Sequence, residues 1–271
     1  MDGTGISVVK NETVGRKGKT AGQPAHTRKV KLGCVFTQAR SDEEGFAIRD
    51  PDSTTYVGAI ETAEEFGKRL YLDAWDRGWS RAERKVVIGD GAEWIWNLAD
   101  QHFPSAIQIV DLFHAREHLW ELARKLHPTA QELKAHYKEV ERKRSMMVHR
   151  YLLDNGKMKK LTAALKDIAG NHPEVAGKFR TEFEYFRRNA MRMRYPKFRR
   201  LHLFAGSGGA RVESTFVIEA GCKTLIGKRH KQSGMFWTVE GANAIVALGA
   251  ACSTTGLRTT GRNGGWIEFN F

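Results

Sequence analysis

The chain has 271 residues, of which 44 are Lys or Arg and 31 are Asp or Glu, so its formal net charge is +13. Hydrophobic residues make up 41% of it, which excludes a wholly disordered protein. No run reaches the roughly eighteen apolar residues of a membrane span, and the first residues lack the apolar core of a secretory signal. Three scattered cysteines form no C-x-x-C pair, which argues against a disulfide framework or a Cys-rich zinc site. We therefore expect a cytoplasmic protein.

The first 126 residues alternate strand-like and helix-like patterns. Alternating apolar and polar positions predict a strand over 29–37, with Val30, Leu32 and Cys34 on one face. Helical spacing of apolar residues predicts an amphipathic helix over 61–77. Next follow a strand at 85–89, a helix at 92–103 with Trp94, Ile95 and Leu98 inward, a strand at 106–110 and a helix from 114 to about 126. This order predicts an α/β sheet.

The second half of the chain begins with a long helical stretch. From 130 to 194 the pattern is helical, with breaks at 154–156 and 171–173, so it predicts an all-α segment. A glycine-rich connector at 206–209 follows. A second α/β-compatible stretch then runs to about Leu248, and its helix is expected to contain Glu219, Lys223 and Arg229.

The positive charge is concentrated in one segment. Residues 123–200 hold 21 Lys or Arg and 8 Asp or Glu, whereas the rest of the chain holds 23 of each. Any single basic run is explained by a solvated helix face, but their concentration favours a polyanion over a membrane surface as partner. Tyr195 and Phe198 lie among basic residues, an arrangement that suits base stacking beside phosphate contacts.

Two acids stand at the ends of apolar runs. Asp2 precedes one run and Asp90 follows another. With a third acid from a late helix they could hold Mg²⁺ or Mn²⁺, which prefer oxygen ligands. Two such ions support phosphodiester displacement. Asp-Gly is also an ordinary turn dipeptide, and each acid taken alone is explained by a turn.

A competing motif is H-x-x-E-H at His114, Glu117 and His118. On a helix the two histidines share one face, as zinc ligands must, with Glu117 beside them as a general base. The pattern is short and no third ligand has an assigned position. A zinc metallopeptidase is therefore the weaker alternative.

Longer motifs carry a specific resemblance. They are the stretches 86–96 and 109–120, supported by 1–5, 28–37, 53–58, 217–226 and 231–237. Together they resemble the bacterial insertion-sequence transposases of the ISKra group, relatives of the Mutator-like DDE transposases. The resemblance covers roughly residues 1–126 and 185–248.

The resemblance implies an α/β fold, an RNase H-like mixed sheet flanked by helices, with an all-α insertion. Residues 1–126 would form the first part of the catalytic domain, 127–200 the basic insertion, and 201–248 the last part. The implied activity is metal-dependent cleavage of DNA at transposon ends, followed by attack of the freed 3′-hydroxyl on target DNA. The partners would be transposon ends and target DNA in the nucleoid, and pairing of two ends leads us to expect a homodimer.

The resemblance also implies the roles of individual residues. The catalytic metal ligands would be Asp2, Asp90 and Glu219, with Mg²⁺ or Mn²⁺ as cofactor. Asp111 and His114 match a supporting D-x-x-H element. Contacts with DNA would come from two groups of basic residues: Arg142, Lys143 and Arg144 in the insertion, and Lys223, Arg229 and Lys231 beside Glu219.

Three departures from the family shape this interpretation. Relatives carry an N-terminal region before the first acid, so this sequence is interpreted as a truncated copy. Phe216 occupies a glycine-like position, which makes Glu213 a competing third acid. The resemblance stops near Leu248, and a shifted reading frame over 257–262 would restore an ending typical of these transposases, so 249–271 is interpreted as a frameshifted tail. The alternative function is a catalytically inactive DNA-binding remnant.

Overall fold

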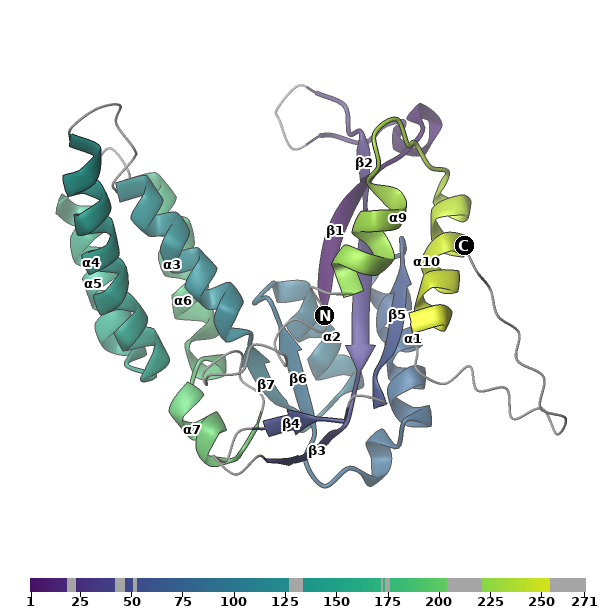
Figure 1. The fold of residues 1–271 in the computed structure, drawn as a ribbon, viewed down its shortest axis with the longest axis horizontal. Helices are drawn as coiled ribbons and strands as arrows, with labels where there is room; N and C mark the ends of the chain where they lie inside the picture. The colour runs from purple at the N-terminus through teal and green to yellow at the C-terminus, as the bar shows by residue number, and fades with distance from the viewer. Residues whose placement is uncertain are drawn as a thin grey trace, which may run out of the picture. The chain divides into compact units, whose positions relative to one another are not determined.

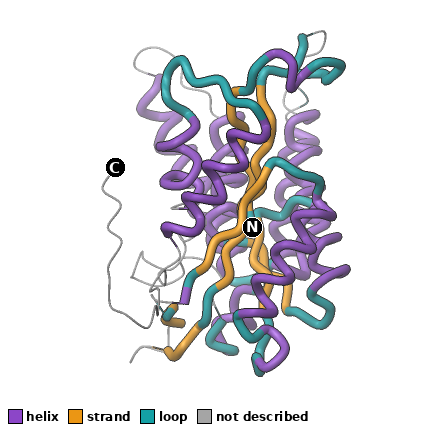
Figure 2. Tube along the Cα trace, turned by 90° about the vertical axis from the view of Figure 1, so that its right-hand side faces the viewer, coloured by secondary structure: helices purple, strands orange, loops and turns teal. Residues whose placement is uncertain are grey.

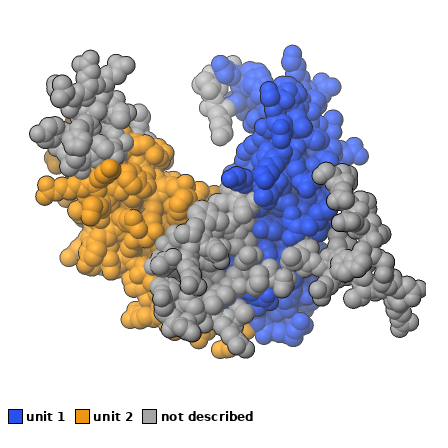
Figure 3. Space-filling view, in the orientation of Figure 1, with its two compact units in different colours: residues 1–40, 48–82, 216–271 blue, residues 41–47, 83–215 orange. Residues whose placement is uncertain are grey.

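The computed structural model describes residues 1–18, 23–41, 47–50, 53–126, 134–171, 173, 176–203 and 221–253. Glu213, Phe216, Glu219, the connector at 206–209 and the tail from 254 onward lie outside these residues. The chain forms two compact units: unit 1 contains residues 1–40, 48–82 and 216–271, and unit 2 contains residues 41–47 and 83–215 (Figure 3). The expected mixed α/β architecture is confirmed. Within the described ranges, no helix has the length and apolar character needed to cross a membrane.

Unit 1 is built on an antiparallel sheet with β2 (Thr27–Val35) at its centre. The chain enters β1 (Asp2–Ser7) directly from its N-terminus (Figure 2), and β1 pairs with β2 from Asp2 opposite Leu32 to Ser7 opposite Thr27. On the other side β5 (Thr55–Ala59) pairs with β2 only from Lys31 to Val35. The short strands β3 (Gln38–Ser41) and β4 (Ala47–Arg49) pair with each other in a separate sheet.

Helices cover both faces of this sheet. Helix α1 (Ala63–Asp76) buries Phe66 and Leu70 against Gly33 of β2. It begins with a capping box in which Thr62 and Glu65 satisfy each other's backbone N–H groups. The late elements η5 (Cys222–Gly227), α9 (Lys228–His230) and α10 (Val239–Ser253) cover the other face (Figure 1). Their core residues, Leu225, Ile226 and Val246 among them, join the apolar side chains of β1 and β2. Two short 3₁₀ turns, η1 (Lys10–Thr13) and η3 (Trp79–Arg81), complete the unit.

Unit 2 begins with the predicted β-α-β succession. Strands β6 (Val86–Gly89) and β7 (Ile107–Val110) are parallel, with Gly89 opposite Val110, and α2 (Glu93–His102) connects them. Helix α3 (Leu112–Leu126) follows. The predicted inward face of α2 needs a correction, because Trp96, at 5% exposure, is buried with Ile95 and Leu98, whereas Trp94 is only half-buried.

The described elements of unit 2 that follow α3 in the sequence are all helical. They are α4 (Lys134–Asp154), α5 (Met158–Asn171), α6 (Ala176–Asn189), the 3₁₀ turn η4 (Ala190–Arg192) and α7 (Tyr195–Arg200). The predicted breaks are confirmed: Gly156 has φ +63° after α4, and Pro173 separates α5 from α6. Helices α3 to α6 lie side by side (Figure 1) and bury residues such as Leu161, Leu165 and Phe179 between them.

The predicted role of two aromatic residues in base stacking is wrong. Tyr195 and Phe198 are 0% and 3% exposed, and the Tyr195 hydroxyl donates a hydrogen bond to the carbonyl oxygen of Val110 at 3.2 Å. The short helix α7 directs both rings into the core of unit 2 while its basic residues face outward. These rings stabilise the end of β7 and are not available to nucleobases.

Candidate functional site

Asp90 lies in a tight turn between β6 and α2. Its Oδ1 accepts a hydrogen bond from the backbone N–H of Ala92 at 2.7 Å, as in an Asx turn. Gly91 has φ +97°, a conformation that favours glycine, and a Cβ at this position would come within 2.5 Å of the Tyr185 ring. The Asp90–Gly91 dipeptide is therefore required by the turn itself. This turn also places Asp90 at the carboxyl end of a parallel strand, where open α/β sheets bind ligands.

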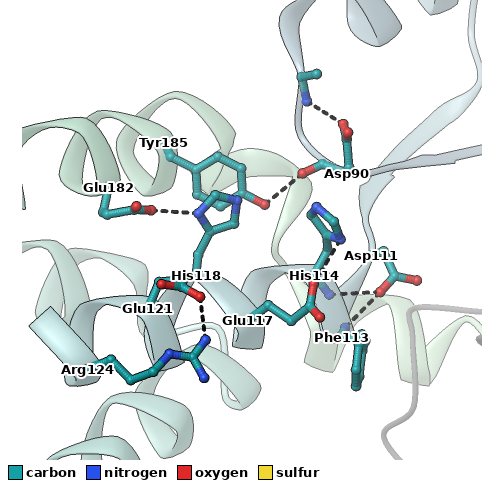
Figure 4. A network of polar contacts seen from close by, with 11 residues as sticks. Asp90, Asp111, Phe113, His114, Glu117, His118, Glu121, Arg124, Glu182 and Tyr185 are labelled. Carbon is teal, nitrogen blue, oxygen red and sulfur yellow. Dashed lines mark hydrogen bonds and ion pairs between the residues drawn. The ribbon is translucent and has the colours of Figure 1, made fainter. Parts of the chain in front are cut away.

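Helix α6 holds this turn from outside the β-α-β succession (Figure 4). The Tyr185 hydroxyl donates to the carbonyl oxygen of Asp90 at 2.9 Å. On the same helix, Asn189 Nδ2 donates to the carbonyl oxygen of Gly91 at 3.2 Å. Asn189 is 3% exposed, and its Oδ1 accepts from the indole N–H of Trp96 at 2.8 Å. We call Tyr185, Asn189 and Trp96 the turn clamp. Its hydrogen bonds fix the carbonyl groups of Asp90 and Gly91, while the Asp90 side chain stays partly exposed.

Asp111 follows β7 as Asp90 follows β6, so both acids stand at the same edge of the parallel pair. Asp111 is 9% exposed, and its Oδ1 accepts from the N–H groups of Phe113 at 2.8 Å and His114 at 3.1 Å. Burial raises the pKa of Asp111, and these two N–H donors oppose the rise. The D-x-x-H element thus caps the start of α3, because its aspartate satisfies backbone groups of the first helical turn.

The histidines of the H-x-x-E-H motif are both engaged with carboxylates. His118 Nδ1 lies 2.6 Å from Oε2 of Glu182 on α6, and His114 Nδ1 lies 3.3 Å from Oε2 of Glu117. The His118 ring stacks on Tyr185 with 3.8 Å between centroids. Across the described portions of the chain, no three His, Cys, Asp or Glu side chains are grouped to hold a metal ion. The observed contacts make His118 a link between α3 and the turn clamp.

Tyr185 is surrounded by acidic groups as well as by the clamp. Burial raises its pKa first, and the carboxylates of Asp90, Asp111 and Glu182 raise it further. The phenol therefore remains a hydroxyl donor throughout the physiological pH range. This protonation state is the one that its hydrogen bond to Asp90 requires.

The expected catalytic acids belong to different parts of the chain. Asp2 is the first residue of β1 in unit 1, where its backbone pairs with Leu32. Asp90 belongs to unit 2, and Glu219 and its competitor Glu213 lie outside the described residues.

The expected DNA-binding residues fall into two groups on separate units. Lys143 and Arg144 are exposed on α4, which also carries Arg142. Lys223, Arg229 and Lys231 are exposed on and after η5, and Lys231 Nζ donates to the hydroxyl of Thr4 on β1. Positive side chains therefore accompany both the strand that carries Asp2 and the helices of unit 2.

Sequence reasoning did not identify the turn clamp. Tyr185 and Asn189 are four residues apart and so lie on one face of α6. An aromatic residue and an amide sharing a face of an otherwise highly charged helix could have indicated a polar contact with another element. The sequence offers no signal that Asp90 is that contact.

Comparison with known proteins adds no family assignment. No family model, no curated protein and no solved structure matches this chain.

Proposed function

We propose that this chain is a DNA transposase of the DDE type, with Asp2, Asp90 and Glu219 as ligands of Mg²⁺ or Mn²⁺. The proposal combines the resemblance of its motifs to ISKra-group transposases with the environment of Asp90. In this proposal the two units contribute to one RNase H-like domain.

The observation that carries the proposal is the support around Asp90. A turn that only reversed the chain would need the glycine and the Asx hydrogen bond. Here Tyr185 and Asn189 hold the turn backbone and Trp96 holds the side chain of Asn189, while the Asp90 carboxylate stands at the carboxyl edge of the parallel pair. Rigid positioning of a carboxylate by surrounding hydrogen bonds is typical of catalytic and metal-binding groups.

The donor chemistry of Asp90 fits a hard divalent cation. One carboxylate oxygen is used by the Ala92 N–H, and a carboxylate has further lone pairs to offer an ion. A bound Mg²⁺ or Mn²⁺ would supply Lewis-acid activation of the phosphodiester and of the attacking hydroxyl. Asp90 would hold that ion, while the turn clamp keeps the carboxylate in place.

The exposed basic residues would bind the DNA on which this chemistry acts. Lys143 and Arg144 on unit 2, and Lys223, Arg229 and Lys231 on unit 1, can each contact phosphate and displace counterions. Such contacts orient the duplex without reading its sequence. They do not depend on the acids, so DNA binding and cleavage can be tested separately.

The test is Mn²⁺-dependent nicking of a supercoiled plasmid that carries the DNA flanking this gene. Asp90→Asn should abolish nicking and leave duplex binding nearly intact, because an asparagine Oδ1 can still accept the Ala92 N–H. Asp167→Asn, which changes an exposed aspartate of α5 in the same unit, is the matched control and should nick like the wild type.

Each result decides between named functions. Nicking that survives in Asp90→Asn would refute the assignment of Asp90. DNA binding by the wild type without nicking would favour the inactive DNA-binding remnant. Absence of both would refute the proposed function as a whole.

A further inference from the structure

Unit 1 contains an open hollow beside the part of β2 that β5 leaves uncovered. β5 pairs with β2 only as far as Lys31 opposite Ala59, and at Ile60 the chain turns away to begin α1. The hollow has a volume of about 570 Å³. Its lining residues are Arg16, Arg28, Lys29, Lys31, Ile60, Glu61, Thr62 and Glu65.

Four of the lining side chains are cations. Arg28, Lys29 and Lys31 come from neighbouring positions of β2, and Arg16 comes from the loop that precedes this strand. Lys29 lies across Gly3 of β1, where any Cβ would collide with the lysine side chain. The glycine thus leaves room for Lys29 to lie along the sheet at the hollow.

The two acidic lining residues are directed to other groups. The Glu61 carboxylate accepts two hydrogen bonds from Arg69, at 3.2 and 3.0 Å, and Arg69 does not line the hollow. The Glu65 carboxylate accepts the Thr62 N–H at 3.1 Å and completes the capping box of α1. The hollow therefore carries an excess of positive charge.

Burial of these cations has an electrostatic cost. Burial is the main cause that lowers the pKa of Lys31; of the nearby charges, Glu61 has the largest effect and raises this pKa, whereas Lys29 and Arg28 lower it. Burial also lowers the pKa of Arg28, and Arg16 adds to the effect. An anion placed among these groups would offset the cost of burying them, because an opposite charge favours the charged form of each side chain.

We propose that this hollow binds a phosphate group, and that the phosphate belongs to the backbone of DNA. Two guanidinium groups can contact phosphate oxygens through paired N–H donors, and two ammonium groups add compact charges. The site adds Arg16, Arg28, Lys29 and Lys31 to the DNA-contacting residues of unit 1. The phosphate site itself does not depend on the proposed function, because the geometry equally admits free phosphate. Only the assignment of that phosphate to DNA rests on the proposed function.

The first arm of the test measures binding of a fluorescent 30-base-pair duplex by anisotropy at several salt concentrations. The variant is Arg16→Gln with Lys29→Gln, which removes two exposed cations of the hollow. The control is Lys68→Gln with Arg81→Gln, two exposed cations of the same unit that do not line the hollow. Both variants lose the same charge, so a general effect of net charge would appear equally in each.

The expected result is a weaker duplex affinity for the hollow variant and a salt slope shallower by about 1 for each phosphate that the variant no longer binds. The control should retain the wild-type slope. In the second arm, inorganic phosphate is added at constant ionic strength and the unfolding temperature is recorded. A rise for the wild type and the control that is absent from the hollow variant would support a phosphate site in the hollow independently of DNA.

The outcomes separate this site from the proposed function. If the wild type binds DNA and both variants behave alike in both arms, the hollow is not a phosphate site, and the proposed function is unaffected. If no protein binds DNA but phosphate raises the unfolding temperature of the wild type and the control alone, the site stands and DNA is not its partner. If the wild type neither binds DNA nor unfolds at a higher temperature with phosphate, the site is refuted.

Discussion

Removing the Tyr185 hydroxyl should loosen the Asp90 turn. Tyr185→Phe keeps the ring that stacks on His118 and deletes the donor to the Asp90 carbonyl oxygen, which lies 2.9 Å away. A neutral hydrogen bond contributes about 1 kcal/mol net, and leaving a partly buried acceptor without its donor costs about 1–3 kcal/mol. Because Tyr185 is only half-buried, we expect a cost near 1 kcal/mol, which corresponds to roughly fivefold more frequent opening of the turn.

Amide hydrogen exchange can measure this opening directly. The Ala92 N–H donates to the Asp90 carboxylate, and the Phe103 N–H donates to Ala99 at the far end of α2. In Tyr185→Phe the Ala92 amide should exchange about fivefold faster relative to the Phe103 amide. If Asp90 holds the metal, the concentration of Mn²⁺ needed for half-maximal nicking should rise as well.

A second tyrosine provides the control. Tyr151 on α4 is 56% exposed, and its hydroxyl accepts a hydrogen bond from Lys157 at 3.2 Å. Tyr151→Phe should leave both amides and the Mn²⁺ requirement unchanged, because water replaces an exposed partner. Equal exchange ratios in Tyr185→Phe, Tyr151→Phe and the wild type would refute the turn clamp.

Three further outcomes follow from the geometry. Urea titrations of two glycine variants should change in opposite directions. Gly91→Ala should lower the free energy of unfolding by at least about 2 kcal/mol, because Gly91 has a positive φ and a Cβ there would collide with the Tyr185 ring. Gly170→Ala, in open space on α5, should raise the free energy of unfolding by about 0.5–1 kcal/mol. Arg116→Gln removes two hydrogen bonds to the half-buried carboxylate of Asp154 on α4, and should lower the free energy of unfolding by about 2 kcal/mol. Arg150→Gln removes an exposed 3.4 Å interaction with the same carboxylate, and should lower it by less than about 0.5 kcal/mol. Burial lowers the pKa of His230, so on acidification the unfolded chain protonates this imidazole before the folded chain does. The free energy of unfolding should therefore fall as the pH drops below about 6.5, by at most about 1.4 kcal/mol per pH unit. His230→Asn should flatten the profile of stability against pH below about 6.5, and an unchanged profile would contradict this reasoning.

Local patterns in the sequence predicted the elements of the fold well. The strand over 29–37, the helix over 61–77 and the β-α-β succession follow from the spacing of apolar residues, which depends only on near neighbours. The structure places these elements at Thr27–Val35, Ala63–Asp76 and Val86–Val110. Errors arose where a residue's environment depends on distant parts of the chain.

Tyr195 is the clearest example of such an error. Its basic neighbours indicated an exposed surface, but its hydroxyl contacts Val110, 85 residues away in the sequence. The hydrogen bond between Tyr185 and Asp90 spans 95 residues. The basic hollow is not predictable from the sequence for a similar reason, because its cations lie in a region whose total charge balances. Only folding brings Arg16 beside the lysines of β2.

The position of the turn clamp changes how the helical segment of unit 2 should be tested. Deleting these helices would be the simplest way to ask whether their basic residues bind DNA. Such a deletion would also remove Tyr185 and Asn189, which hold the Asp90 turn, and Glu182, which holds His118. Loss of activity would then have two explanations. Since α6 exposes Arg187 and Arg188 while it holds that turn, only point substitutions of exposed basic residues can separate DNA binding from the positioning of Asp90.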